Sequence, residues 1–109
     1  MTLVVGIAGG GTKSRAVLAD ENLKVLARSV GGPANYQALG LGPVRENLEA
    51  LLADLLAQGG TARTAIQSVV AGLAGASTQD DERILEGLLG DMGLSGRRRV
   101  VADARVDLH

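Results

Sequence analysis

Two leucine-rich segments with helical periodicity constrain this chain more than any other feature. Each has an apolar stripe at spacings of three and four residues, and each is followed by a short apolar run. The first helix is predicted to begin at Pro43, with Gly42 as its N-cap. The second is predicted to begin at Ser77 or Thr78 and to end at Gly93. The chain therefore alternates helices with runs that have the length of buried strands.

These apolar runs predict five β-strands. Three precede the first helix, at residues 2–7, 15–20 and 24–30, and one follows each helix, at 66–74 and 97–102. The order βββαβαβ is typical of an α/β domain. Three leading strands can form an antiparallel meander, and the two βαβ units then add parallel strands. We expect a five-stranded mixed sheet in the order 3-2-1-4-5.

The handedness of the crossovers predicts how this sheet is covered. Connections between parallel strands are almost always right-handed, so both helices are expected on the same face of the sheet. The strand after the first helix is nevertheless apolar on both sides, and alternation places Ile66 and Val70 on one face, opposite Val69. Because parallel strands with two apolar faces are usually covered on both, the open face needs a partner.

Composition excludes several kinds of site. The chain has 109 residues, no cysteine, one histidine and a net charge of -1, which excludes thiolate chemistry, cysteine-ligated metals and a histidine triad. The near-neutral charge argues against a nucleic-acid or anionic membrane partner. No apolar run approaches the ~18 residues of a membrane span, and no signal peptide is recognised. We expect one cytoplasmic domain over residues 1–109, with no linker or repeat dividing it.

A glycine-rich loop is the first candidate for a ligand site. It follows the first strand and consists of Gly9, Gly10, Gly11, Thr12 and Lys13. Successive glycines let backbone N–H groups converge on an anion, and the hydroxyl and ammonium groups add further donors. No helix follows, so the loop is neither a Walker A motif nor a dinucleotide fingerprint. A phosphate cradle and a ligand-free hairpin turn both remain open from the loop alone.

Four motifs together resemble a known enzyme family. They are GIAGGGTKS at 6–14, GGPANY at 31–36, AGLAGA at 71–76 and ADA at 102–104. In this order and spacing they resemble the N-acetylglucosamine kinase family, which is allied to the BadF/BadG-type ATPases within the actin-like sugar-kinase superfamily. The resemblance covers essentially the whole chain but only the N-terminal half of such a kinase. It implies a ribonuclease-H-like or actin-like half domain whose final helix is truncated.

The resemblance implies roles for individual positions. The glycine loop would hold the β- and γ-phosphates of ATP, and Asn35 would hydrogen-bond sugar hydroxyls. Asp103 would be the general base that deprotonates the attacking sugar hydroxyl. Four further residues would approach the sugar closely: Gly72, Ala74, Gly75 and Ala76. The family uses ATP and Mg²⁺ with a small sugar substrate. The alternatives from the residues alone are a turn role for Asn35 and a capping role for Asp103, while Tyr36 is expected to anchor its loop.

Two positions depart from the family pattern. The family usually has an aspartate where this chain has Ala8, and that carboxylate serves the magnesium–phosphate complex. Bacterial members often have an asparagine where this chain has Ala102. The second phosphate loop and the adenosine-binding residues of the family have no counterpart in the chain. We therefore expect that the chain alone binds neither ATP nor Mg²⁺ productively and has no kinase activity.

Two other functions are compatible with the same pattern. A non-catalytic module that self-associates would bury the open sheet face, most simply as a two-fold homodimer. A ribonuclease-H-like nuclease shares the order of elements, but such nucleases need several clustered carboxylates to hold two metals. Ala8 and the near-neutral charge argue against the nuclease. The sugar-kinase lobe is the interpretation that the four motifs favour.

Overall fold

The three N-terminal strands form the antiparallel meander that the sequence predicts. In the computed structural model, which describes residues 2–101, these strands are β1 (Leu3–Gly9), β2 (Ser14–Asp20) and β3 (Val25–Gly31). β1 pairs with β2 and β2 with β3, both antiparallel. β1 is therefore left with one free edge, on which the parallel part of the sheet is built.

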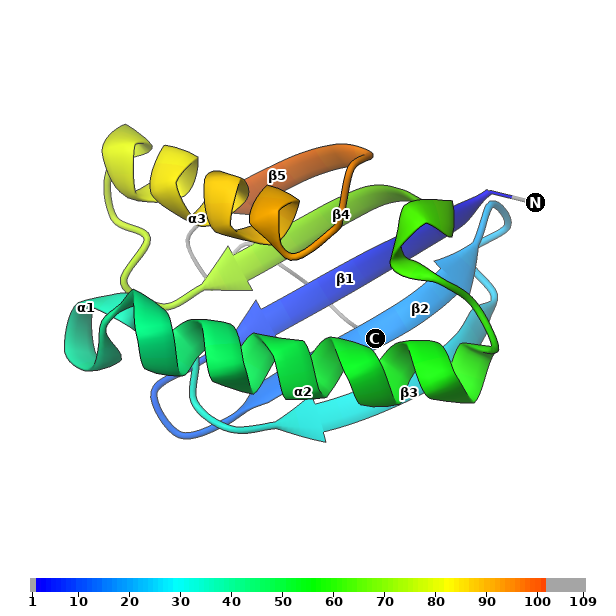
Figure 1. Ribbon diagram of the computed structural model, residues 1–109, viewed down its shortest axis with the longest axis horizontal. Helices are drawn as coiled ribbons and strands as arrows, with labels where there is room; N and C mark the ends of the chain where they lie inside the picture. Colours follow the sequence, from blue (N-terminus) through cyan, green and yellow to red (C-terminus); the bar gives the residue numbers. More distant parts are fainter. Residues whose placement is uncertain (1, 102–109) are drawn as a thin grey trace.

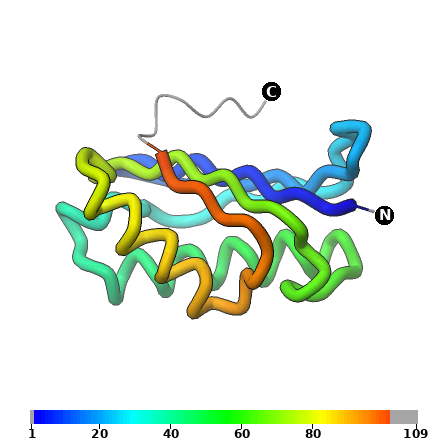
Figure 2. Tube along the Cα trace, turned by 90° about the horizontal axis from the view of Figure 1, so that it is seen from above, coloured from blue at the N-terminus to red at the C-terminus, as the bar shows by residue number. Residues whose placement is uncertain are grey.

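The parallel half of the sheet consists of β4 (Ile66–Leu73) and β5 (Arg97–Val101). β4 pairs with β1 and β5 with β4, both parallel, so the order is β3-β2-β1-β4-β5. This confirms the predicted mixed sheet. Helices α2 (Leu41–Gly59) and α3 (Gln79–Asp91) make the two crossovers. Both lie on the same side of the sheet, as the handedness argument predicts (Figures 1 and 2).

The helix boundaries differ from the prediction at one end of the first crossover. α2 begins at Leu41 with Gly40 as its N-cap, so the prediction of Gly42 as the N-cap is wrong. A four-residue helix, α1 (Tyr36–Leu39), precedes it and has no counterpart in the sequence prediction. A short 3-10 turn, η1 (Arg63–Ala65), leads into β4. α3 has the predicted N-cap at Thr78, whose hydroxyl accepts a hydrogen bond from the Asp81 amide.

The core lies between the sheet and the two long helices. Both leucine stripes contribute to it, and their fully buried members pack against the inner side of β1, β2 and β4. The buried stripe residues are Val44, Leu48, Leu51, Leu52, Leu55, Leu56, Leu85, Leu88, Leu89 and Met92. Ile84 remains 44% exposed, so it lies outside this core. The stripes therefore serve packing, which leaves the loops at the strand ends free for a ligand site.

A bulge in β4 changes which side chains reach the open face. Leu3 pairs with Ile66 but Val4 pairs with Ser68, so Gln67 is an extra residue. Ile66 is therefore 2% exposed on the helical side, whereas Val70 is 40% exposed on the other side. The prediction that Ile66 and Val70 share a face is wrong, because alternation cannot anticipate a bulge. Within residues 2–101, no helix is long and apolar enough to cross a membrane.

Candidate functional site

Three loops meet at the carboxyl ends of β1 and β4. These strands are parallel neighbours, and Gly9 and Leu73 are register partners at their last positions. The loop after β1, the loop after β3 and the loop after β4 all leave the sheet at this edge, beside α1 and the start of α3 (Figure 1). The first three of the four motifs therefore converge, as their common assignment to one site requires. Asp103, Ala102 and the rest of the fourth motif lie outside the described residues.

Backbone hydrogen bonds hold the three loops together. The Ala34 amide donates to the Gly10 carbonyl oxygen at 3.0 Å, and the Ala74 amide donates to the Gly9 carbonyl oxygen at 2.8 Å. Ala34 is fully buried. A Cβ on Gly9 would lie 2.7 Å from the Ala34 Cβ and 2.8 Å from a Leu73 methyl carbon, so only glycine fits there. The junction is therefore a close-packed unit at its base.

The tip of the glycine loop is open. Gly11, Thr12 and Lys13 are exposed, and a Cβ on Gly11 would meet nothing within 4 Å. The Gly10 amide donates to the Lys13 carbonyl oxygen at 2.9 Å, so the hairpin itself uses one of the donors that an anion would need. The loop can reach a phosphate through its exposed tip and the Lys13 ammonium. It presents fewer converging amides than three consecutive glycines suggest.

Asn35 occupies the N-cap of α1. Its side-chain carbonyl oxygen accepts from the amides of Gln37 at 3.1 Å and Ala38 at 3.2 Å. The side-chain nitrogen, Nδ2, has no hydrogen-bond partner among residues 2–101. The capping geometry therefore fixes which end of the carboxamide is available: Asn35 can act toward a ligand as a donor.

The loop after β4 lies directly against Asn35. Gly75 has φ +91, and a Cβ on it would lie 2.7 Å from the Asn35 Oδ1 and 2.9 Å from the Gln37 Cγ. The Gln37 side-chain nitrogen donates to the Gly75 carbonyl oxygen at 3.3 Å. The neighbouring candidates differ in exposure: Gly72 and Ala76 are buried, and Ala74 is half-buried. Gly75 is thus the position where the loop after β4 touches the Asn35 turn.

Asp81 is the polar residue at this junction that the motifs do not include. It is 8% exposed, and its carboxylate accepts from the Tyr36 hydroxyl, the Gln37 side chain, and the backbone and side chain of Ser77. The bond from Tyr36, followed by those from Thr78 and Ser77, outweighs burial and lowers the pKa of Asp81 to about 2. The same bond raises the pKa of Tyr36 above its ordinary value. The sequence signal was the capping box before α3, which predicts a helix start and not a contact with Tyr36.

The sequence matches a family model over most of its length. Residues 5–97 match the model of the BadF/BadG/BcrA/BcrD ATPase family. The chain belongs to this family. A curated relative, the N-acetylmuramic acid/N-acetylglucosamine kinase of Clostridium acetobutylicum, is 31% identical to this chain over 108 residues. That alignment covers 99% of this chain and 35% of the kinase, so the chain spans about a third of its relative. The resemblance to BadF/BadG-type ATPases and amino-sugar kinases is confirmed.

Solved structures with the same fold belong to proteins of several different functions. A Chromobacterium violaceum protein assigned as an N-acetylglucosamine kinase superposes with a TM-score of 0.67 at 20% identity, covering 94% of this chain and 35% of that one. Component A of (R)-2-hydroxyglutaryl-CoA dehydratase from Acidaminococcus fermentans gives 0.62 at 15% identity, covering 94% and 31%. YeaZ from Pseudomonas aeruginosa gives 0.54 at 16% identity, covering 94% and 43%. These matches establish the actin-like fold.

Ala8 occupies the position at which the resemblance implies a carboxylate that serves the magnesium–phosphate complex. Ala8 lies near the end of β1 with Arg15 and Gly72 as its cross-strand neighbours. A methyl group cannot ligate a cation. Among residues 2–101, no group of three or more histidine, cysteine, aspartate or glutamate side chains could hold a metal ion. The described residues therefore offer no cluster of carboxylates for a resident Mg²⁺.

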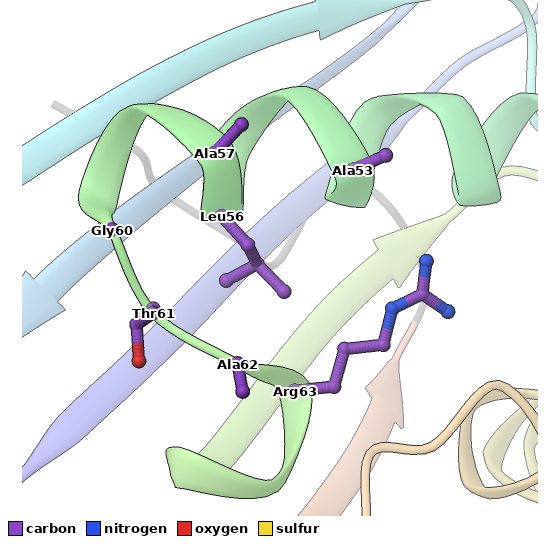
Figure 3. Close-up of a pocket in the computed structure, with 7 residues that line it drawn as sticks. All are labelled: Ala53, Leu56, Ala57, Gly60, Thr61, Ala62 and Arg63. Carbon is purple, nitrogen blue, oxygen red and sulfur yellow. The ribbon is translucent and has the colours of Figure 1, made fainter.

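A cavity of about 470 Å³ lies at the opposite end of the sheet. It is lined by the last turns of α2 and the segment that leads into η1 (Figure 3). Its charged lining residue is Arg63, which pairs with Glu49 at 2.7 Å and donates to the Met92 carbonyl oxygen at 2.6 Å. Because this guanidinium already forms an ion pair and a hydrogen bond, it has little capacity left to bind a polar ligand in the cavity. The loop junction remains the candidate site of the chain.

Proposed function

We propose that this chain is the N-terminal lobe of an ATP-dependent amino-sugar kinase of the N-acetylglucosamine type. The observation that carries the proposal is the convergence of the glycine loop, the Asn35 turn and the Gly75 loop at one edge of the sheet. These segments are the ones to which the kinase resemblance assigns phosphate and sugar contacts. The kinase relative that aligns with nearly the whole chain supports the same assignment.

On the sugar side, Asn35 would act as a hydrogen-bond donor. Its carbonyl oxygen is used by the cap of α1, so its Nδ2 would donate to a hydroxyl or acetamido oxygen of the sugar. Gly75 would place the loop after β4 beside the sugar, because the absence of a side chain lets this loop lie directly against Asn35. Gly72, Ala74 and Ala76 would form the adjoining small-residue wall. Asp103 would accept the proton of the attacking hydroxyl.

On the phosphate side, the exposed tip of the glycine loop would contact ATP. Thr12 and Lys13 would supply a hydroxyl and a positive charge beside the amides of the loop, while ATP supplies the phosphoryl group. Ala8 provides no carboxylate for the magnesium–phosphate complex. We therefore propose that the chain alone, which would act in the cytoplasm, binds ATP poorly and does not turn it over.

The proposal is tested by a binding measurement paired with an activity assay. We expect N-acetylglucosamine to bind the isolated chain and we expect no sugar-dependent ATP hydrolysis or phosphorylation above a buffer control. The matched variant is Asn35→Asp, because aspartate caps a helix as well as asparagine does but has no N–H donor. Sugar binding should be lost in Asn35→Asp while the helical spectrum is unchanged. Equal sugar affinity in both proteins contradicts the assigned role, and robust turnover contradicts the proposed inactivity.

A homodimer through the open sheet face is the second proposal. The face without helices exposes Val30 by 69% and Val70 by 40%, which favours burial against a second copy. Exposed arginines share this face by strand register: Arg15, Arg28, Arg97 and Arg99. Their mutual repulsion across a two-fold axis should weaken the dimer at low salt. Sedimentation should show association that increases with salt, and a monomer at all salt concentrations contradicts the dimer.

A further inference from the structure

A cluster of hydrogen bonds behind the candidate sugar site is not used by the proposed function. At its centre is Asp81, near the start of α3. One carboxylate oxygen accepts from the Tyr36 hydroxyl and from the Gln37 side-chain nitrogen at 3.2 Å. The other accepts from the Ser77 amide, the Ser77 hydroxyl and the Thr78 amide, each at 3.1 Å. Tyr36 and Asp81 are 45 residues apart in the chain, so this contact joins two separate elements.

The contacts and burial of Asp81 argue against a direct role in ligand binding. Both carboxylate oxygens are already engaged by two or more donors, and the residue is 8% exposed. A carboxylate in this state has little free acceptor capacity for a substrate. What it does contact is the segment that carries Asn35: Tyr36 and Gln37 follow Asn35 directly and form the first turn of α1.

A capping role for Asp81 explains only part of this cluster. The bond from the Thr78 amide completes the capping box of α3, and the bonds from Ser77 come from the residue directly before that cap. The bonds from Tyr36 and Gln37 add nothing to the cap of α3. They hold α1, a helix of four residues that is too short to be stable by itself. α1 in turn presents the backbone amides that orient the Asn35 carboxamide.

We propose that Tyr36 and Asp81 form a positioning pair that fixes α1 against the Gly75 loop and thereby aims the Asn35 side chain at the sugar. The pair acts through Asn35 and does not itself touch substrate. This inference rests on the proposed sugar site for its consequence, but the mechanical part, the stabilisation of α1 by Tyr36, stands on the hydrogen bonds alone. Gln37 supports the same arrangement by bridging Asp81 and the Gly75 carbonyl oxygen.

The mechanical part is tested by amide hydrogen exchange in the 109-residue chain. Tyr36→Phe removes a single hydroxyl and leaves the bonds of Asp81 to Ser77 and Thr78 in place. We expect exchange at the Gln37 and Ala38 amides to accelerate about tenfold, since a hydrogen bond to a charged group is lost, while core amides of β1 and β4 accelerate by no more than the loss of global stability measured by urea unfolding. Unchanged exchange at Gln37 and Ala38 overturns the inference, because it leaves Asp81 with a capping role only.

Asp81→Asn and Asp80→Asn form a matched pair for the same measurement. Both remove one negative charge from the first turn of α3, but Asp80 is exposed and pairs with Arg83, whereas Asp81 contacts Tyr36. We expect faster exchange at Gln37 and Ala38 in Asp81→Asn and wild-type exchange there in Asp80→Asn. Equal acceleration in the two variants would assign the effect to the helix N-terminus and would overturn the pair.

The consequence for the sugar is tested by affinity for N-acetylglucosamine. We expect Tyr36→Phe to weaken binding by about tenfold with the folded spectrum intact, and Asp80→Asn to leave it unchanged. If the wild-type chain binds no sugar, the proposed function fails, while the exchange experiment still decides the mechanical claim. If the wild-type chain and Tyr36→Phe bind equally well, the sugar site stands and the positioning role is overturned.

Discussion

The two sides of the candidate site are built differently. On the proposed sugar side, the side chains of Tyr36 and Gln37, which follow Asn35, donate hydrogen bonds to Asp81 and to the Gly75 carbonyl oxygen, far away in sequence. On the proposed phosphate side, the loop from Gly11 to Lys13 is exposed, and Ala8 stands where the resemblance implies a carboxylate. The first is fixed by its own contacts before any ligand arrives. The tip of the second has no such contacts to other elements within the described part of the chain.

This difference bears on which of the two proposed ligands the chain alone would bind. A site that is already ordered loses little conformational entropy when a ligand binds. A loop with an exposed tip and a single cation gives only a weak, solvent-screened attraction to phosphate. On the proposed assignment, the chain would bind a sugar better than a nucleotide. Substitutions on the two sides of the site test this contrast.

The base of the junction should be the most sensitive position. Gly9→Ala places a Cβ 2.7 Å from the Ala34 Cβ and 2.8 Å from a Leu73 methyl carbon, so we expect a loss of stability. Overpacking of this kind costs about 1–3 kcal/mol. Gly11→Ala is the matched control at the open tip, where a Cβ meets nothing within 4 Å, and should change stability by less than about 0.5 kcal/mol. Urea unfolding measures both, and equal losses would contradict the contrast.

Gly75→Ala should perturb the sugar side more specifically. The φ of +91 disfavours alanine, and the new Cβ would lie 2.7 Å from the Asn35 Oδ1. We expect a loss of about 1–2 kcal/mol, together with a shifted Asn35 side-chain resonance. The resonances of Gly11 and Thr12 should not move. A shift in the glycine loop as large as that at Asn35 would show that the two sides are not independent.

The pH dependence of the sugar side follows from Asp81. Its pKa is lowered to about 2 in the folded chain, so its contribution to stability is present above its ordinary value of 3.8. That contribution is lost as the pH falls from about 4 toward 2. Tyr36 is the only aromatic residue, so the near-ultraviolet signal comes from the partner of Asp81. The transition should be absent in Asp81→Asn, and its persistence there would assign it to another carboxyl group.

The same contact makes an opposite prediction at alkaline pH. The hydrogen bond to Asp81 raises the pKa of Tyr36, so the stabilisation is complete below pH 10 and is lost as the pH rises through the higher folded value. In Asp81→Asn, the absorbance titration of the phenol should move down toward the ordinary value of 10.0. An unchanged titration would mean that Tyr36 and Asp81 are not in contact in solution.

The fold was largely predictable, whereas the junction was not. The stripes of α2 and α3, the Thr78 cap and the strand order follow from periodicity and handedness, which are local or nearly universal. α1 was missed because four residues are too few to show a period. The bulge at Gln67 and the contact between Tyr36 and Asp81 depend on how distant segments pack, and alternation or capping motifs carry no such information. Asp103 was assigned by resemblance and lies outside the described residues.

Residue-resolved NMR of the chain, titrated in turn with N-acetylglucosamine and with ATP, tests the contrast most directly. We expect the sugar to shift the resonances of the Asn35 side chain and the Gly75 amide at millimolar concentrations. ATP should shift only Gly11 to Lys13, and more weakly. Lys13→Ala should weaken the ATP response by about fivefold, as loss of one exposed charge pair implies. A strong response of the glycine loop to ATP with no response of Asn35 or Gly75 to the sugar would contradict the account.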